Sequence, residues 1–149
     1  MDDEILTYID RNPIAILGTL NPDGTPHGAV VYACLMDDRR HTIYFLTKTE
    51  TAKYKNLRDR LHVSLTIVNP EENSTLQAGG TAHEVHDPQV IDAVMKKIVR
   101  AHTTAKEWLP PIAKLRAGAY VVVGIQVSRA RLAYFKGMQI GDEHIFTES

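Results

Sequence analysis

The sequence predicts a mainly β fold with flanking helices, in which about six antiparallel strands form a closed or partly closed barrel. Short apolar or alternating segments rich in β-branched residues recur along the 149 residues of the chain. Tight turns join the first three of these segments and make these early strands antiparallel neighbours. Helical patterns occur before the first strand and between groups of strands, rather than after every strand as in a doubly wound parallel sheet.

The composition indicates one globular domain over residues 1–149. The chain carries a net charge of −1, with 44% hydrophobic and 23% charged residues, so nothing favours nucleic acid or a membrane as a partner. Its one cysteine, Cys34, excludes an internal disulfide and suits a reducing compartment. The start of the chain lacks the basic and apolar regions of a signal peptide, and no apolar run is long enough to cross a bilayer. We therefore expect a cytoplasmic protein.

The expected elements follow one another with short connections. They are a helix over 2–11, strands over 14–20, 26–36 and 42–47, a helix from about 50 to 61, strands over 63–68 and 75–85, a helix over 87–102, and a strand over 120–127 that continues through 130–135.

The first helix and the hairpin after it have clear boundary signals. Ile5, Tyr8 and Ile9 share one helix face, and Asn12-Pro13 ends the helix. The first strand leads into Asn21-Pro22-Asp23-Gly24, which has Pro second and Gly fourth, as a type I turn prefers. The second strand is apolar almost throughout, which predicts burial on both of its faces. The two strands therefore form a hairpin.

The middle of the chain combines a strand with a helix. The segment 42–47 is β-branched and aromatic, which predicts a buried strand. From about Glu50 the spacing becomes helical and places Ala52, Leu57 and Leu61 toward one side, with Lys and Arg on the other.

The second half of the chain contains two strands and one helix. The strand 75–85 is interrupted by Gly79-Gly80, which indicates a bulge or a close backbone approach by a ligand or partner. Asp87-Pro88 starts a helix, with Asp as N-cap and Pro at the first helical position. The segment 103–114 is expected to be irregular, and 120–127 is a strongly apolar strand.

The junction between the strand 42–47 and the next helix is the first candidate binding site. A helix N-terminus offers unpaired N–H groups and the positive end of a dipole, so it suits an anion. Hydroxyls of Thr49 and Thr51 and the charges of Lys48 and Lys53 would suit a phosphate. Glu50 would repel that phosphate unless its side chain points outward. The alternative is an ordinary N-cap threonine beside solvated lysines.

Several short segments occur in a characteristic order over residues 14–135. They are Ala15–Leu20, Asp23–His27, Ile43–Thr47, Thr51–Lys53, Lys55–Leu57, Val63–Leu65 and Gly80–Ala82. In this order and spacing the chain resembles the pyridoxamine phosphate oxidase-like flavoproteins, also called the FMN-binding split barrel family. The resemblance implies an antiparallel six-stranded split β-barrel with flanking helices. It also implies FMN as the cofactor and a homodimer with two FMN sites at the subunit interface.

The resemblance implies a set of cofactor-binding residues. They are His27, Gly28, Ala29, Val30, Val31, Leu46, Thr47, Lys48, Thr51, Lys53 and Gln77. The strand 27–32 would line the isoalloxazine mainly through backbone groups, and the end of the strand 42–47 would contact the ring system. Thr51 and Lys53 match hydroxyl-x-lysine phosphate ligands, which Lys48 could assist. Gln77 matches a glutamine that reaches the flavin from the partner subunit.

The chain departs from true pyridoxamine phosphate oxidases in two places. Its tail, 137–149, contains neither the Trp nor the Arg that complete the substrate site of those enzymes, and Ala52 stands where they often carry a second basic residue. The resemblance thus implies an FMN-dependent oxidoreductase with a reaction other than that of vitamin B6 synthesis. No catalytic residue is assigned; His27 and Tyr32 are candidates only because they lie on the flavin-lining strand.

Other functions remain open. The protein could be a non-catalytic flavin-binding electron-transfer or storage protein, or the same barrel could hold a deazaflavin or haem. A cofactor-free barrel that serves as a dimeric interaction module is the alternative from another class.

Some further residues are candidate sites with plain structural alternatives. His83 and His86 would point to opposite faces of a strand, so no metal site is expected. Cys34 on an apolar strand is expected to be a small core residue. Arg131 and Lys136 could meet an anionic substrate or could simply be solvated.

Overall fold

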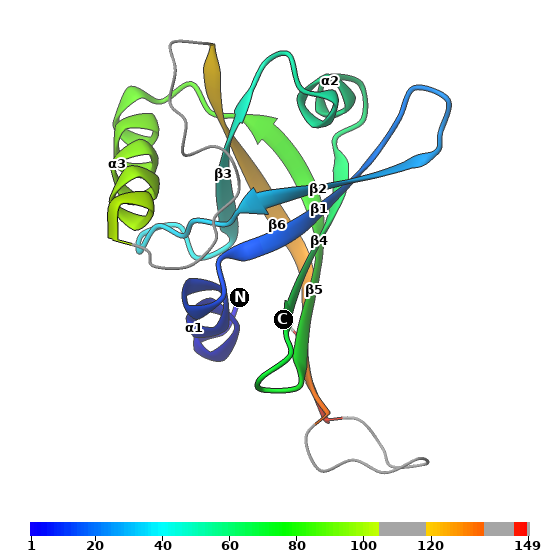
Figure 1. Ribbon diagram of the computed structural model, residues 1–149, viewed down its shortest axis with the longest axis vertical. Helices are drawn as coiled ribbons and strands as arrows, with labels where there is room; N and C mark the ends of the chain where they lie inside the picture. The colour runs from blue at the N-terminus through cyan, green and yellow to red at the C-terminus, as the bar shows by residue number, and fades with distance from the viewer. Residues whose placement is uncertain (105–118, 136–144, 149) are drawn as a thin grey trace.

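The computed structural model describes residues 1–104, 119–135 and 145–148 (Figure 1). Residues 105–114 of the segment predicted to be irregular, 103–114, lie outside the described residues, and so does Lys136. The elements, in chain order, are α1 (Asp3–Arg11), β1 (Ile14–Leu20), β2 (Pro26–Tyr32), β3 (Thr42–Lys48), α2 (Ala52–Asp59), β4 (His62–Asn69), β5 (Ser74–Glu84), α3 (Pro88–Thr104), β6 (Tyr120–Tyr134) and β7 (Ile145–Glu148).

The strands form one curled antiparallel sheet, a half-barrel with helices at its margins. Its main order is β2-β1-β4-β5-β6-β3, and β7 pairs with β6 outside this path. The predicted mainly β, six-stranded split barrel with flanking helices is therefore confirmed. Figure 1 shows α1, α2 and α3 around the curled sheet, with the β1–β2 hairpin extending away from it.

The position of β3 in the sheet differs from expectation. Tight turns were expected to make the first three strands neighbours, but β3 pairs along its whole length with β6. Next to β2, the chain forms only an isolated bridge between Cys34 and Tyr44. The physical reason is that the connection between β2 and β3, residues 33–41, is long enough for β3 to reach the opposite edge of the sheet and pair with β6. Because the sheet is curled, the Cys34–Tyr44 bridge then joins its two edges.

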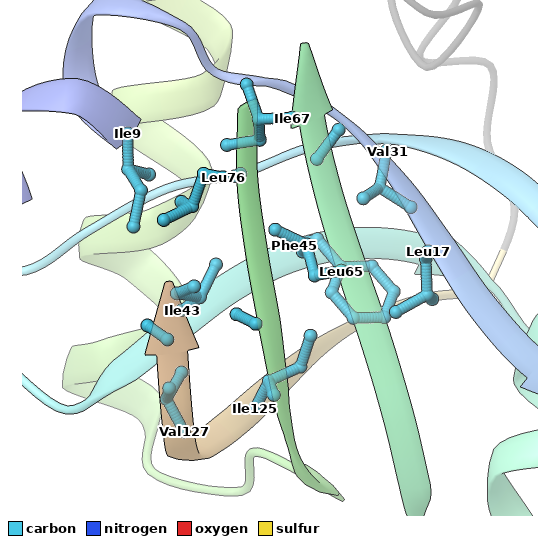
Figure 2. Packing of buried hydrophobic residues seen from close by; sticks show 14 of the residues in the cluster. Ile9, Leu17, Val31, Ile43, Phe45, Leu65, Ile67, Leu76, Ile125 and Val127 are labelled. Atoms are coloured by element: carbon cyan, nitrogen blue, oxygen red, sulfur yellow. The ribbon is translucent and has the colours of Figure 1, made fainter. Parts of the chain in front are cut away.

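The barrel interior is one large apolar cluster. Strand alternation sends Leu17, Phe45, Leu65, Leu76 and Ile125 to the inside, where each is at most 1% exposed. Figure 2 shows these side chains pointing toward one another across the sheet. This cluster defines an inner face of the sheet, so the neighbouring residues of β4 and β5 must face outward.

A second apolar cluster lies under α3. Val90, Val94 and Ile98 pack against Leu46 and Val122 on the outer side of the β3–β6 pair. The helix begins after Asp87, as predicted, and the Asp87 carboxylate accepts a hydrogen bond from the Gln89 backbone N–H. The apolar face of this helix is therefore a core contact.

The prediction that the second strand is buried on both faces is wrong. Only Val31 of β2 is fully buried, while Gly28 is exposed and Val30 is 41% exposed. The reason is that β2 is a terminal strand of the sheet, and no described segment of the same chain covers its outer face.

The predicted bulge occurs at the glycine pair of β5, but its extra residue lies on the paired strand β6. Gly79 pairs with Arg129 and Gly80 with Val127, which leaves Ser128 as the extra residue of β6. A Cβ atom on Gly80 would lie 2.2 Å from the Gln126 carbonyl oxygen. The close backbone approach at Gly80 thus comes from the chain's own strand β6.

The predicted apolar side of the second helix is only partly correct. Leu57 is buried, together with the polar Asn56, but Ala52 is exposed and Leu61 is 48% exposed. The reason is that α2 ends at Asp59, so Leu61 does not belong to the helix face.

Candidate functional site

Thr51 caps the start of α2. Its Oγ1 accepts a hydrogen bond from the Tyr54 backbone N–H at 3.4 Å and donates to the Lys48 carbonyl oxygen at 2.9 Å. The same oxygen lies 3.0 Å from the hydroxyl of Thr47. The predicted capping role of Thr51 is therefore confirmed, and its hydroxyl has structural partners already. A ligand role for Thr51 would require its proton to turn away from Lys48.

Lys53 occupies the second position of α2 and is half-buried. Burial lowers the pKa of its ammonium group, because desolvation disfavours the charged form. In the described ranges, no carboxylate pairs with this ammonium. The backbone N–H groups of Ala52 and Lys53 belong to the first helical turn, where no intrahelical acceptor exists. A partly desolvated cation therefore lies beside two backbone donors.

Lys48 and Glu50 flank this helix start. The Lys48 ammonium lies 5.4 Å from the centre of the Tyr120 ring, a cation–π contact across the β3–β6 pair. Glu50 is exposed, as the phosphate hypothesis requires. Its carboxylate is therefore solvated rather than buried among the candidate ligands.

Leu46 and Thr47 are each only 1% exposed. Leu46 packs in the cluster under α3, and Thr47 reaches the hydroxyl of Thr51. Their side chains are therefore occupied by the protein, and only their backbone groups could contact a ring.

The backbone of β2 has an open edge. Hydrogen bonds from Asn21 to Thr25 and from Ala33 to Pro13 continue the β1–β2 ladder at its two ends. Antiparallel ladders alternate, so Gly28 and Val30 direct their N–H and C=O groups away from β1. His27, Ala29 and Val31 direct theirs toward β1. Of the five predicted cofactor-binding residues on β2, only Gly28 and Val30 thus have backbone N–H and C=O groups that point away from β1.

Gln77 lies apart from the helix start. It is exposed on the outer face of β5 and lines a groove of about 770 Å³ over β4, β5 and β6. Neither Thr51 nor Lys53 lines that groove. One copy of the chain therefore does not bring Gln77 together with the predicted phosphate ligands.

Two side chains that the sequence analysis did not single out hold α2 against the hairpin. Asn56, 5% exposed, donates from Nδ2 to Thr19 Oγ1 and to Asn21 Oδ1, each at 3.1 Å. Arg60 donates to the carbonyl oxygens of Asn21 and Pro22 at 2.8 and 3.0 Å. A polar residue beside Leu57 on the inner side of a helix was the available signal, because buried amides require partners.

Other predicted features lie elsewhere. Cys34 is buried under α3, as expected, and burial raises the pKa of its thiol to about 11. Within the described part of the chain, no three His, Cys, Asp or Glu side chains gather as metal ligands would. None of the described helices combines the length and apolar character that a membrane-spanning segment requires.

The sequence match identifies the family. A family model described as pyridoxamine 5'-phosphate oxidase matches residues 1–134. Because the match covers most of the chain, the protein belongs to this family. No curated protein sequence matches the chain.

Solved structures share the fold at low identity. A conserved hypothetical protein, Rv2991 from Mycobacterium tuberculosis, is 21% identical with a TM-score of 0.71, covering 96% of this chain and 94% of its own. A pyridoxamine 5'-phosphate oxidase-related, FMN-binding protein from Nostoc punctiforme is 12% identical with a TM-score of 0.64, covering 98% and 94%.

Two similar structures are associated with other cofactors. A heme-binding protein from Mycobacterium smegmatis is 17% identical with a TM-score of 0.71, and the alignment covers 97% of this chain and 56% of that one. An F420 reductase is 20% identical with a TM-score of 0.60, covering 80% and 90%.

Proposed function

We propose that this protein is an FMN-dependent oxidoreductase that works as a homodimer, with FMN held between the two copies. The observation that carries the proposal is Lys53, a half-buried cation at a capped helix start with no carboxylate partner in the described chain. Membership of the pyridoxamine 5'-phosphate oxidase family supports it. The FMN-binding protein from Nostoc punctiforme, which has a similar fold, adds further support.

A phosphate group suits this helix start physically. Desolvation lowers the pKa of Lys53, and a nearby phosphate would favour the charged ammonium again. The N–H groups of Ala52 and Lys53 would add hydrogen bonds at the positive end of the helix dipole. Glu50, whose side chain is exposed, does not oppose this arrangement.

The homodimer is proposed because the outer face of the sheet is open and partly apolar. Ile16, Val30 and Val68 are 50%, 41% and 54% exposed on the neighbouring strands β1, β2 and β4, respectively. Gln77 lies on the same face but away from Lys53 of its own copy. Association of two such faces would bury the apolar side chains and could bring the Gln77 of one copy to the flavin of the other.

The chemistry would come from the cofactor. Bound FMN supplies hydride or electron transfer. In this proposal, the Gly28 and Val30 backbone groups orient the ring, and the helix start holds the phosphate. Tyr32 is a half-buried phenol whose pKa is raised by burial, so it keeps its proton at physiological pH. No residue is assigned as a general acid or base.

Two other cofactors remain candidates, because structures with a similar fold are an F420 reductase and a heme-binding protein. Lys53 and the helix start favour a phosphorylated cofactor, which agrees with FMN or a deazaflavin better than with haem. A non-catalytic flavin carrier would have the same phosphate ligands and differ by having no substrate beside the ring. We also keep the cytoplasmic location as a prediction.

Absorbance and mass spectrometry of the ligand released from purified protein test the cofactor. A yellow protein that releases FMN supports the proposal. A colourless protein that cannot be reconstituted with FMN refutes it. A released haem or deazaflavin would replace FMN with that cofactor.

The variant Lys53→Ala tests the phosphate assignment. A charge-assisted hydrogen bond contributes about 1.5–3 kcal/mol, so the FMN dissociation constant should rise by about 10- to 100-fold. Lys55→Ala on the exposed side of the same helix is the matched control and should change FMN affinity by less than about twofold. The stability of the FMN-free protein should hardly change in either variant. Equal FMN affinity in Lys53→Ala and wild type would refute the assignment.

A further inference from the structure

The groove on the outer face of the sheet is polar and cationic. Its volume is about 770 Å³, within the range of small-molecule sites. Its polar lining consists of Ser64, Thr66, Gln77, Arg129 and Arg131. Hydroxyls, an amide and two guanidinium groups are hydrogen-bond donors, and none of the lining residues is acidic.

Strand register explains why these side chains meet. Ser64 pairs with Gly79, and Gly79 pairs with Arg129. In the next row of the same face, Thr66 pairs with Gln77, and Gln77 with Arg131. The groove is therefore formed by two adjacent rows that cross β4, β5 and β6.

Gly79 shapes the groove. A Cβ atom at this position would lie 3.1 Å from Nε of Arg129 and 3.6 Å from its Cγ. The side chain of Arg129 therefore lies against the glycine, across β5, instead of extending straight into solvent. The bulge at Ser128 gives Arg129 this register.

The charge of the groove is local. The whole chain carries a net charge of −1, so two adjacent guanidinium groups are not part of a generally basic surface. No carboxylate pairs with Arg129 among the residues that the structure describes. Arg131 has Glu148 of β7 as its cross-strand neighbour, so Arg129 is the stronger candidate for an added anion.

We infer that this groove binds the carboxylate or phosphate group of a small-molecule substrate, with Arg129 as its main ligand. The inference rests on the proposed function, because Gln77, proposed to reach the partner's flavin, lies in the same groove. An anion held there would place the rest of the substrate beside the flavin. Guanidinium suits this task because it binds both oxyanions through two parallel hydrogen bonds.

The test uses the FMN-loaded protein and two probes, malonate and inorganic phosphate, at constant ionic strength with chloride as the balancing anion. The readout is the NMR signal of the Arg129 side-chain Nε–H, assigned by its loss in Arg129→Gln. We expect a saturable shift with at least one probe. Arg129→Lys, which keeps the charge but loses the two-bond geometry, should weaken probe binding several-fold, as followed on backbone signals of β5.

Matched variants keep the result specific. Arg129→Gln should weaken probe binding at least tenfold on the same β5 signals and leave FMN affinity within about twofold. Arg11→Gln, which removes an exposed guanidinium at the end of α1 that pairs with Glu72, should leave probe binding unchanged. The preferred probe identifies the anionic group as carboxylate or phosphate.

Several results would overturn the inference. The first is a probe response that grows linearly and equals the response to chloride. The second is unchanged probe affinity in Arg129→Gln. The third is a tenfold loss of FMN affinity in that variant, which would make the groove part of the FMN site. A wild-type protein that takes up no FMN refutes the proposed function instead. The same titration of the FMN-free chain then tests whether the groove binds an anion, and a response that does not saturate overturns the inference.

Discussion

Gly80 gives the most direct test of the packing between β5 and β6. The substitution Gly80→Ala would place a Cβ atom 2.2 Å from the Gln126 carbonyl oxygen and 3.1 Å from Cγ2 of Ile125. Carbon–oxygen contacts between strands are normally about 3.3–3.6 Å, so the two backbones would have to separate by about 1 Å. The carbonyl belongs to a paired strand and cannot rotate away as a side chain could.

The expected cost is large for one methyl group. Overpacking of this kind lowers the free energy of unfolding by about 1–3 kcal/mol. The reduced entropy of the unfolded chain raises it by about 0.4–1 kcal/mol. We therefore expect the free energy of unfolding to fall by about 2 kcal/mol. Urea unfolding of the FMN-free protein, followed by circular dichroism at one fixed protein concentration, measures it.

Two other glycines serve as controls. A Cβ atom on Gly28 would have its nearest neighbour at 3.8 Å, an ordinary contact. At Gly79 the neighbour at 3.1 Å is the flexible side chain of Arg129, which can move. Gly28→Ala and Gly79→Ala should therefore each change stability by less than about 1 kcal/mol. A free energy of unfolding for Gly80→Ala within about 0.5 kcal/mol of the wild type would contradict the argument that Gln126 leaves no room for a Cβ atom.

Two further predictions concern Thr51 and Cys34. Thr51→Val removes the hydroxyl that caps α2 and should cost about 1 kcal/mol in urea unfolding, whereas Thr51→Ser should be nearly neutral; equal stabilities of the two variants would contradict the capping role. The Cys34 thiol has a pKa of about 11, so only about 0.1% is thiolate at pH 8, and Ellman's reagent should react with it only after unfolding. Rapid reaction of the native protein would show that Cys34 is accessible.

The sequence predicted the local features well because their causes are local. The ends of α1, the hairpin turn and the start of α3 each depend on a few adjacent residues, such as Asn12-Pro13 or Asp87-Pro88. The turn closes with a hydrogen bond from Gly24 N–H to the Asn21 carbonyl, and Gly24 has a φ of 86°, which glycine adopts without strain.

The exposure of β2 and the partner of β3 could not be predicted in this way. An apolar strand can be buried by its own chain or by another copy. The residue type of Val30 therefore could not show which of the two would cover it. The pairing of β3 with β6 depends on a long connection whose path no local signal defines.

Only part of the candidate site could be predicted. The helix start at Thr51 and Lys53 is continuous in sequence, so its capping and charge were visible there. The groove combines residues 64, 77 and 129, which lie far apart in the chain and meet through strand register. Arg129 faces outward next to Ser128, which is also exposed, because the bulge interrupts the alternation that a strand pattern assumes.

The β3–β6 pairing also has a consequence for the ribosome-bound chain. Thr42 pairs with Gln126, so 126 − 42 = 84 residues separate these partners. At about 5–20 residues per second, β3 waits roughly 4–17 seconds for β6 to be synthesised. During that time the strand Thr42–Lys48, in which the six residues 42–47 are buried in the folded protein, lacks the strand that pairs along its length. Exposed strands of this kind are ligands for chaperones, so we expect nascent chains that end before residue 120 to bind them, and release to follow the emergence of β6.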